Sequence, residues 1–453
     1  MAVNRRLLLW LVKAYLKKWG KVILLSFVAG LIVFLTLLST SRFLLHLLPL
    51  ERRVSIGYIG AYRIDGLPKD LQQKLSRGLT KVGADGSVSA NASSSWQIKD
   101  DGKTYVFTLR DDVYYSDGQK LTARSVPYEF RGVKKEVLGN RTVAFHLQDK
   151  YAPFLVTASR PIIRKGFVGL GEYGIQNVEL NGEFVRTLSL VSKKNKLLVE
   201  KYIFYPSEEA LKIAFSLGEV KKAVGLSDDT FINTQFSNFK DVSVLKSTDK
   251  DLLVTLFFDN RDPVLSDPKL RSGLSYAIPE SFSQGERSFL PYSPTFQYAS
   301  KEGIEKHQDF THASLLLSPE KNASPGSHLT LTLKTLSKYR QTAEAIAEAW
   351  KKVNVETTIE EVDGRPDSFQ VYLGDFSIPR DPDQYSLWHS TSANNITHFK
   401  NTRIDKLLED GRKTTVLKER KDIYNDFQKY LLADSPAAFL YFPYEYTVSR
   451  NGN

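Results

Sequence analysis

Two motifs in the sequence match the residue patterns of catalytic or cofactor sites, but each lacks the context that the chemistry needs. GLGEYG, residues 169–174, satisfies G-x-G-x-x-G, whose last glycine must open a helix that faces a pyrophosphate. The residues that follow, IQNVEL, read as a strand, so the motif indicates a glycine-rich turn. S-x-x-K occurs at residues 247–250 and 318–321, and neither copy is accompanied by S-D-N or K-T-G. We therefore expect no dinucleotide site and no serine nucleophile.

Histidines and carboxylates could hold a metal ion or move protons. The seven histidines include no H-x-x-x-H pair on a helix and have no carboxylate neighbour at ligand spacing, so we expect no metal site and no cofactor. Asp381 and Asp383 flank Pro382, and carboxylates so placed more often fix a loop by local hydrogen bonds than act as acid and base. Since no nucleophile, base and orienting group assemble, the sequence predicts a binding protein without catalytic residues.

Length and composition predict a folded protein of several lobes. The 453 residues exceed one ordinary core, and 42% are hydrophobic, 12% aromatic and 25% charged. There is no cysteine, which excludes disulfides, thiol chemistry and a lipid-modified N-terminal cysteine. The formal charge of +11 includes six basic residues and no acids within residues 1–21. The rest of the chain has only a mild excess of positive charge and no basic stripe, which disfavours nucleic acid as a partner.

The N-terminus predicts a membrane anchor. Residues 22–41 carry no charge and match the ~20 apolar residues that span a bilayer as a helix. The basic segment 1–21 predicts a cytoplasmic N-terminus, so residues 42–51 become a stalk and the rest of the chain lies outside. A cleaved signal is the alternative, because Ser39 and Ser41 have cleavage-like spacing, but its apolar region would be only ~7 to 15 residues long. We favour a single-pass anchor in the cell membrane.

Patterns along the rest of the chain predict an α/β scaffold. In WQIKDDGKTYVFTLRDDVYYSDG, residues 96–118, apolar residues alternate around the Asp101-Gly102 turn and predict a hairpin. Residues 329–334 and 355–362 read as strands around a helix at 342–352, which predicts a parallel βαβ unit. Two further helices are expected around residues 404–408 and 423–431.

The longest of these segments carries a family resemblance. WQIKDDGKTYVFTLRDDVYYSDGQKLTARSV resembles the signature W-x-x-x-x-DGKTYTFTLR-x-x-V-x-x-SDG-x-x-L-T-A-x-x-V of the family 5 extracellular solute-binding proteins, the oligopeptide and dipeptide receptors of ATP-driven importers. Residues 210–220, 256–280, 381–413 and 415–443 are similar to further segments of that family in the same order. The resemblance covers nearly everything after residue 53.

The resemblance implies a hinged, two-lobed fold of the periplasmic-binding-protein type (cluster C), here with an N-terminal transmembrane helix. Lobe I is expected to comprise residues 52–255 and 375–453, and lobe II residues 256–374. Crossing strands would lie near 256–260 and 371–376. Ligand would bind between the lobes and stabilise the closed form.

The implied function is that of a monomeric, membrane-anchored receptor that binds peptide and delivers it to the permease of an ABC importer. In peptide binders of this family an acidic residue holds the ligand's α-ammonium, but Ile378 stands at that position, and Arg380 nearby favours an anionic group. An oligosaccharide or a metal chelate is therefore an alternative ligand. A sensor or chaperone role without transport is an alternative function.

The resemblance also indicates which residues line the cleft. Tyr385 and Trp388 have a core position as their alternative, and Asn394 and Asn395 could instead cap a turn. The expected ligand-binding residues are Tyr58, Tyr62, Phe376, Ser377, Arg380, Asp381, Tyr385, Trp388, Asn394 and Asn395.

Overall fold

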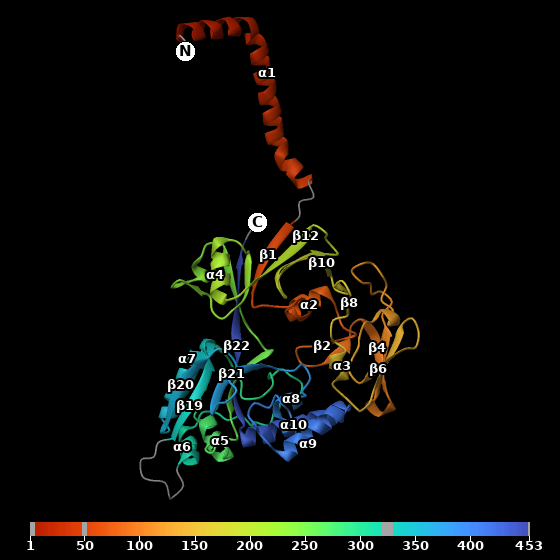
Figure 1. The fold of residues 1–453 in the computed structure, drawn as a ribbon, viewed down its shortest axis with the longest axis vertical. Coiled ribbons are helices and arrows are strands. Elements are labelled where there is room, and N and C mark those ends of the chain that lie inside the picture. The colour runs from red at the N-terminus through yellow and green to blue at the C-terminus, as the bar shows by residue number, and fades with distance from the viewer. Residues whose placement is uncertain (1–4, 48–51, 319–328, 452–453) are drawn as a thin grey trace.

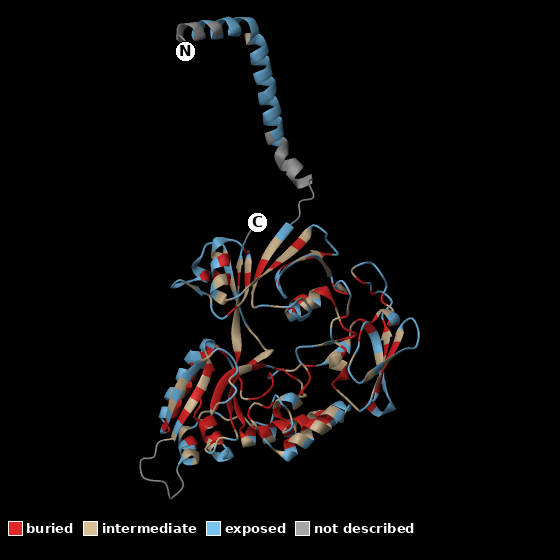
Figure 2. Cartoon of the chain, viewed as in Figure 1, coloured by how far each residue is buried: buried red, intermediate tan, exposed pale blue. Residues whose placement is uncertain are grey.

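A computed structural model describes residues 5–47, 52–318 and 329–451, and its first helix stands apart from everything else (Figure 1). Helix α1, Arg5–Leu47, contains a stretch, Val12–Leu37, that is long and apolar enough to cross a membrane. This stretch packs against no other part of the protein (Figure 2). No described residue of α1 contributes to the five hydrophobic clusters of the remaining chain, so the lobes are built around cores of their own.

A first sheet lies nearest to the anchor (Figure 1). Its strand order is β10-β11-β12-β1-β13-β22, with β16 also paired to β22, and β1 runs parallel to both of its neighbours. Helix α2, Lys69–Leu75, covers one face and α4, Glu208–Leu217, covers the other. The strands are β1 Arg52–Ile59, β10 Tyr173–Asn181, β11 Phe184–Ser192, β12 Leu198–Tyr205, β13 Lys222–Leu226, β16 Val242–Thr248 and β22 Ala437–Arg450.

The predicted hairpin is confirmed and belongs to a small, separate sheet. Its order is β4-β5-β7-β6, with β4 Ser93–Lys99, β5 Thr104–Leu109, β6 Val133–Val137 and β7 Thr142–Leu147. Tyr105, Phe107 and Leu109 all lie in one hydrophobic core, as the alternation predicts. Asp101 and Gly102 have φ angles of 53° and 89°, the left-handed conformation that their turn requires.

The second large sheet is covered by helices on both faces. Its order continues from β22 through β17, β21, β19 and β20, and β18 also pairs with β22. Helices α5, α6 and α7 pack in the cluster on one face, and α8, α9 and α10 pack in the cluster on the other. The parallel pairing of β19 with β20 across α7 confirms the predicted βαβ unit.

The strands are β17 Leu252–Phe258, β18 Gly285–Arg287, β19 Leu329–Leu336, β20 Val355–Val362 and β21 Val371–Ser377. The helices are α5 Pro268–Tyr276, α6 Phe310–Leu317, α7 Arg340–Lys351, α8 Tyr385–Trp388, α9 Thr402–Lys413 and α10 Leu417–Asp434.

Short elements complete the described chain. The strand that follows GLGEYG is β10, so no helix opens at that motif. The short elements are α3 Phe154–Thr157, β2 Thr80–Val82, β3 Val88–Ala90, β8 Ile163–Arg164, β9 Val168–Gly169, β14 Thr230–Phe231 and β15 Thr234–Gln235, together with the 3-10 turns Ile64–Gly66, Asp100–Gly102, Ala123–Ser125, Phe236–Asn238 and Ser337–Tyr339.

Two segments cross between the large sheets. Strand β22 pairs with β17 through residues 437–441 and with β16 through residues 444–450. Residues 249–251 connect β16 to β17 beside it. We define lobe I as residues 52–248 and 444–451 with the small sheet, and lobe II as residues 252–318 and 329–441.

This packing differs from the expected lobe boundaries. The sequence predicts that residues 375–453 join lobe I, whereas α9 and α10 share a core with β17 and β21, through residues such as Phe257, Phe376, Leu408 and Phe427. The segments expected to cross, 256–260 and 371–376, instead pair with each other inside the second sheet, with Leu256 opposite Leu373. The reason is hydrophobic burial: the apolar side chains of the C-terminal helices cover a face of the second sheet that would otherwise be exposed.

Candidate ligand-binding site between the lobes

A cavity of about 230 Å³ lies where the two lobes and a crossing segment meet. Lobe I contributes a residue of α2 and the turn after β2, and lobe II contributes two loops. The lining residues are Gln73, Val82, Gly83, Ala84, Gly86, Lys250, Asp251, Ser293, Phe296, Ile378, Pro379 and Arg380. Because its walls come from both lobes, relative motion of the lobes would open or close this cavity.

The turn between β2 and β3 touches lobe II directly. The Gly86 amide donates to the Gly83 carbonyl oxygen at 3.0 Å, and Gly86 has a φ of 76°. A Cβ atom at Gly86 would lie 2.0 Å from Cε2 of Phe296, a distance that real Cβ atoms essentially never show. Next to this contact, the Gln297 amide donates to the Asp85 carbonyl oxygen at 2.8 Å. The lobes are therefore in contact at the cavity.

Charged groups from both lobes converge on Asp251 in the crossing segment. Lys69 Nζ, from lobe I, lies 2.8 Å from Oδ2 of Asp251, and Arg380 Nη2, from lobe II, lies 3.8 Å from the same oxygen. The Ile378 amide donates to the Asp251 carbonyl oxygen at 2.8 Å and holds the Arg380 loop against the crossing segment. Arg380 and Asp251 keep about a third and a half of their side-chain surface exposed, so both can reach a solute.

The lobe I side of the crossing is acidic. The hydroxyl of Tyr58 donates to the Asp70 carboxylate. Burial, followed by the charges of Asp249, Asp70 and Asp251, raises the pKa of Glu445. Burial and then Asp70 and Glu445 also raise the pKa of Tyr62. The expected residues Tyr58 and Tyr62 thus lie among carboxylates beside the crossing segment.

Four of the other expected ligand residues line one of two cavities. Arg380 lines the cavity between the lobes. Phe376, Trp388 and Asn394 line a different cavity of about 260 Å³ within lobe II, together with Arg365. Ser377 is exposed at the end of β21, opposite Leu252.

Three expected residues are held by contacts within lobe II. Asp381 is buried and accepts two hydrogen bonds from Arg420, at 2.5 and 2.9 Å. Asn395 is buried and donates to the Phe399 carbonyl oxygen at 2.8 Å. The ring of Tyr385 stacks on His389 with 3.9 Å between the ring centres.

The pair Asp381 and Asp383 fixes its loop, as the spacing predicts. The Asp383 amide donates to Asp381 Oδ1 at 3.0 Å, and the Tyr385 amide donates to Asp383 Oδ1 at 3.0 Å. Arg412 Nε lies 2.7 Å from Asp383 Oδ2. These bonds place the loop that carries Arg380.

Several lining residues could not be inferred from the sequence. The Asp85-Gly86 pair marks a turn, but no local pattern shows that this turn meets Phe296, which lies more than two hundred residues later. Ser293 stands in a segment without a motif, and the S-x-x-K match that ends at Lys250 gives no indication of a cavity. Only the three-dimensional packing of the lobes brings them together.

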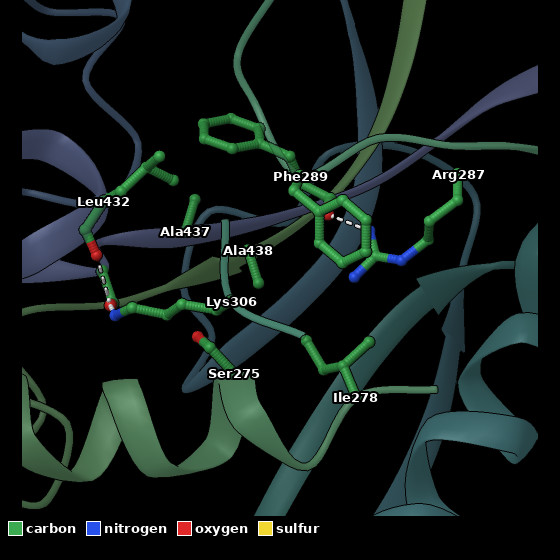
Figure 3. Close-up of a pocket in the computed structure, with 10 residues that line it drawn as sticks. Ser275, Ile278, Arg287, Phe289, Lys306, Leu432, Ala437 and Ala438 are labelled. Atoms are coloured by element: carbon green, nitrogen blue, oxygen red, sulfur yellow. Dashed lines mark hydrogen bonds between the residues drawn. The ribbon is translucent and has the colours of Figure 1, made fainter. Parts of the chain in front are cut away.

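A third cavity lies inside lobe II and is too small for a solute (Figure 3). Its volume is about 20 Å³, room for about one water molecule. Burial, followed by the charge of Arg271, lowers the pKa of Lys306 in its wall to about 8. Within the described ranges, no group of three or more His, Asp or Glu side chains could hold a metal ion.

Comparisons with known proteins point to one family. The family described as bacterial extracellular solute-binding proteins, family 5 (Middle) matches residues 88–398. Protein XP55 of Streptomyces lividans is 28% identical over 83% of this chain and 80% of its own length. The oligopeptide-binding protein AppA of Bacillus subtilis is 24% identical over 84% of this chain and 83% of its own length. The structure of NikZ from Campylobacter jejuni in complex with Ni(L-His) superposes with a TM-score of 0.70, at 20% identity, over 88% of this chain and 94% of that one. This likeness confirms the predicted two-lobed α/β fold.

Proposed function

The chain belongs to the bacterial extracellular solute-binding proteins of family 5, and on this basis we propose that it is the receptor of an ABC importer, which binds a short peptide in the cavity between its lobes. The observation that carries the proposal is the composition of that cavity's wall, which includes residues of α2, the β2–β3 turn, the crossing segment and the Arg380 loop. A solute that contacts all four binds the closed form better than the open form, and this difference drives closure.

The size and charge of the cavity favour a short solute with an anionic end. About 230 Å³ is below the ~300 Å³ at which typical ligand pockets begin, which suits a peptide of few residues. Arg380 presents a planar guanidinium that can bind a carboxylate through two parallel hydrogen bonds. Apolar Ile378 and Phe296 line the same space and suit the hydrocarbon part of a solute.

The protein acts by binding and release rather than by catalysis. The ionisable residues that line the cavity are Lys250, Asp251 and Arg380, and Asp251 is paired with Lys69 and Arg380 from the two lobes. Helix α1 anchors it in the cell membrane as a monomer, with the lobes outside the cell. Tethering raises the concentration of the loaded receptor at the permease in the same membrane.

Retention of solutes by the purified full-length chain in nanodiscs tests this function. The chain is incubated with a library of peptides of two to nine residues, an oligosaccharide mixture and a nickel–histidine complex, and the retained species are identified by mass spectrometry. We expect intact short peptides. Retention of sugars or the nickel complex alone would replace the peptide by that ligand, and recovery of hydrolysed peptides would contradict a binding-only role.

A matched pair of variants locates the bound solute. Gln73 lines the cavity, so Gln73→Trp fills it and should abolish retention. Gln97 is exposed on β4, and Gln97→Trp should retain peptides as the unmodified chain does. Equal retention by both variants would place the ligand elsewhere.

A further inference from the structure

The end of the first sheet that carries the anchor is basic. Strand β1 begins there at Arg52, next to the start of β12, because Arg52 pairs with Leu198. Four other parts of the sheet lie at the same end: the β11–β12 turn, the start of β13, the start of β16 and the end of β22. The pairings of Lys222 with Ser449 and of Val242 with Arg450 place them there. The basic residues at this end, which we call the anchor edge, are Arg52, Arg53, Lys193, Lys194, Lys196, Lys221, Lys222, Lys240 and Arg450.

The anchor edge is exposed and carries more basic than acidic residues. All of its basic residues are exposed except Lys222, which is partly buried. The described acidic residues nearby include Asp112, Asp117, Glu172, Glu219 and Asp241, and Glu172 pairs with Lys194 Nζ at 2.7 Å. Lysine and arginine residues from separate loops are therefore gathered at one end of one sheet.

The opposite end of the same sheet carries several carboxylates, and Lys69 pairs with one of them, Asp251. Asp249 and Asp251 follow the end of β16, and Glu445 lies beside them on β22. Asp70, at the start of α2, contributes to the same field, because its charge raises the pKa of Glu445. In the first sheet the carboxylates beside the crossing segment thus lie at the end away from α1, and the anchor edge lies at the end nearest to α1 (Figure 1).

The link between the membrane-spanning stretch and β1 is short enough for the anchor edge to reach the bilayer. Helix α1 ends at Leu47 and β1 begins at Arg52, and the four residues between them can span no more than about 18 Å even when fully extended. The ten helical residues after Leu37 add about 15 Å. Lipid headgroups occupy roughly the first 5 to 8 Å outside the hydrocarbon. With a screening length of about 8 Å in physiological salt, the edge can enter the field of charged headgroups.

We propose that the anchor edge docks on anionic phospholipid headgroups of the membrane that holds α1. The chemistry is that of lysine and arginine side chains with phosphate oxygens, which is charge-assisted and sensitive to salt. Docking orients the strands of the first sheet away from the bilayer and holds the ligand cleft, at their far end, clear of it. The inference concerns only this edge and is independent of the ligand in the cleft.

Vesicle flotation of residues 52–453 tests the proposal without the contribution of α1. This fragment keeps all five hydrophobic clusters. We expect it to float with phosphatidylcholine vesicles that contain 40% phosphatidylglycerol, not to float with pure phosphatidylcholine vesicles, and to be released by 0.5 M NaCl. Equal binding to both vesicle types, or no binding to either, would overturn the proposal.

Two triple charge reversals separate the anchor edge from charge in general. Lys196→Glu/Lys221→Glu/Lys240→Glu removes exposed lysines from three loops of the edge. It should lower the vesicle partition coefficient at least tenfold, given that each basic residue near an anionic surface strengthens binding several-fold. The control, Lys351→Glu/Lys418→Glu/Lys429→Glu, makes the same charge change on α7 and α10 of lobe II and should bind as the unmodified fragment does. Circular dichroism confirms that both variants are folded, and an equal loss in both would refute the assignment to the edge.

Discussion

The backbone amide of Gln297 donates a hydrogen bond to the carbonyl oxygen of Asp85 at 2.8 Å, and the two residues belong to different lobes. Beside this bond, Gly86 packs against the ring of Phe296 so closely that no side chain fits between them. The contact between the lobes at this point therefore requires a glycine in the β2–β3 turn.

Gly86→Ala should impair closure. The added Cβ would lie 2.0 Å from Phe296 Cε2, so the turn and the ring must separate. We expect a population of more open molecules, visible as a larger radius of gyration in small-angle scattering of the ligand-bound protein. We also expect the affinity for the ligand to fall about tenfold or more, because the closed form is the one that binds.

The control for this variant is Gly118→Ala. Gly118 has a φ of 86°, similar to the 76° of Gly86, but nothing lies within 4 Å of its added Cβ. It should lose about 1 to 2 kcal/mol of stability from left-handed strain and close normally. Adding Phe296→Ala to Gly86→Ala should restore closure, and failure to do so would show that the ring is not the obstacle.

Arg380→Gln should weaken binding of peptides with a free C-terminal carboxylate. Arg380 lines the interlobe cavity and is partly exposed, so its guanidinium can reach a carboxylate there. Titration calorimetry should show at least a tenfold loss of affinity for the free peptide and little change for the same peptide with an amidated C-terminus.

Arg365→Gln is the matched control, because Arg365 lines the separate cavity within lobe II. It should leave both affinities unchanged. If Arg365→Gln had the larger effect, the ligand's anionic end would lie in lobe II and not between the lobes.

Local patterns predict the elements well because they depend on neighbours in the chain. The hairpin around Asp101-Gly102 and the βαβ unit of residues 329–362 follow from alternation and helical spacing, and both are present. The same reasoning cannot place the C-terminal helices, because α9 has an apolar face that would suit either lobe. The C-terminal helices join lobe II because Leu408 and Phe427 pack against the second sheet, through contacts that are distant in sequence.

Contacts between distant segments also decide which residues line the binding site, and local patterns do not reveal them. Arg380 is expected from the resemblance and does line the interlobe cavity. Asp381, its neighbour, is also expected to bind ligand, yet it is paired with Arg420, a residue of α10 whose position cannot be read from the loop. A single carboxylate in a loop has no pattern that distinguishes a ligand contact from a buried ion pair.

Asp381→Asn should destabilise lobe II strongly. Arg420 and Asp381 are both buried, and the pair is connected by two hydrogen bonds. Loss of one partner leaves a buried charge without compensation, which typically costs about 3 to 5 kcal/mol. Urea denaturation should show a lower midpoint by a corresponding amount.

A surface pair serves as the comparison for this loss. Asp410 lies 2.7 Å from Lys406 Nζ on α9, with side chains that are 39% and 67% exposed, so Asp410→Asn should cost less than about 1 kcal/mol. In the double variant Asp381→Asn/Arg420→Met, no charge is left unpaired, and the loss should be smaller than the sum of the single losses. Strict additivity would mean that the two side chains act independently.

Glu445→Gln should stabilise the protein at neutral pH but not at acidic pH. Burial and then the charges of Asp249, Asp70 and Asp251 raise the pKa of Glu445 in the folded state above its value in the unfolded chain. The protonated form is therefore favoured by folding, so the stability associated with Glu445 is fully present below its unfolded pKa and is lost as pH rises through its folded pKa.

Glutamine imitates the protonated carboxyl group and cannot lose a proton, so it should avoid this loss. The melting temperature of Glu445→Gln minus that of the unmodified protein should be near zero at pH 4 and should increase toward pH 7. Glu356→Gln, at an exposed position on β20, is the control and should give a difference that does not vary with pH. A Glu445→Gln difference that is constant or largest at pH 4 would mean that Lys69, which pairs with Asp251, compensates the carboxylates at the crossing segment in full.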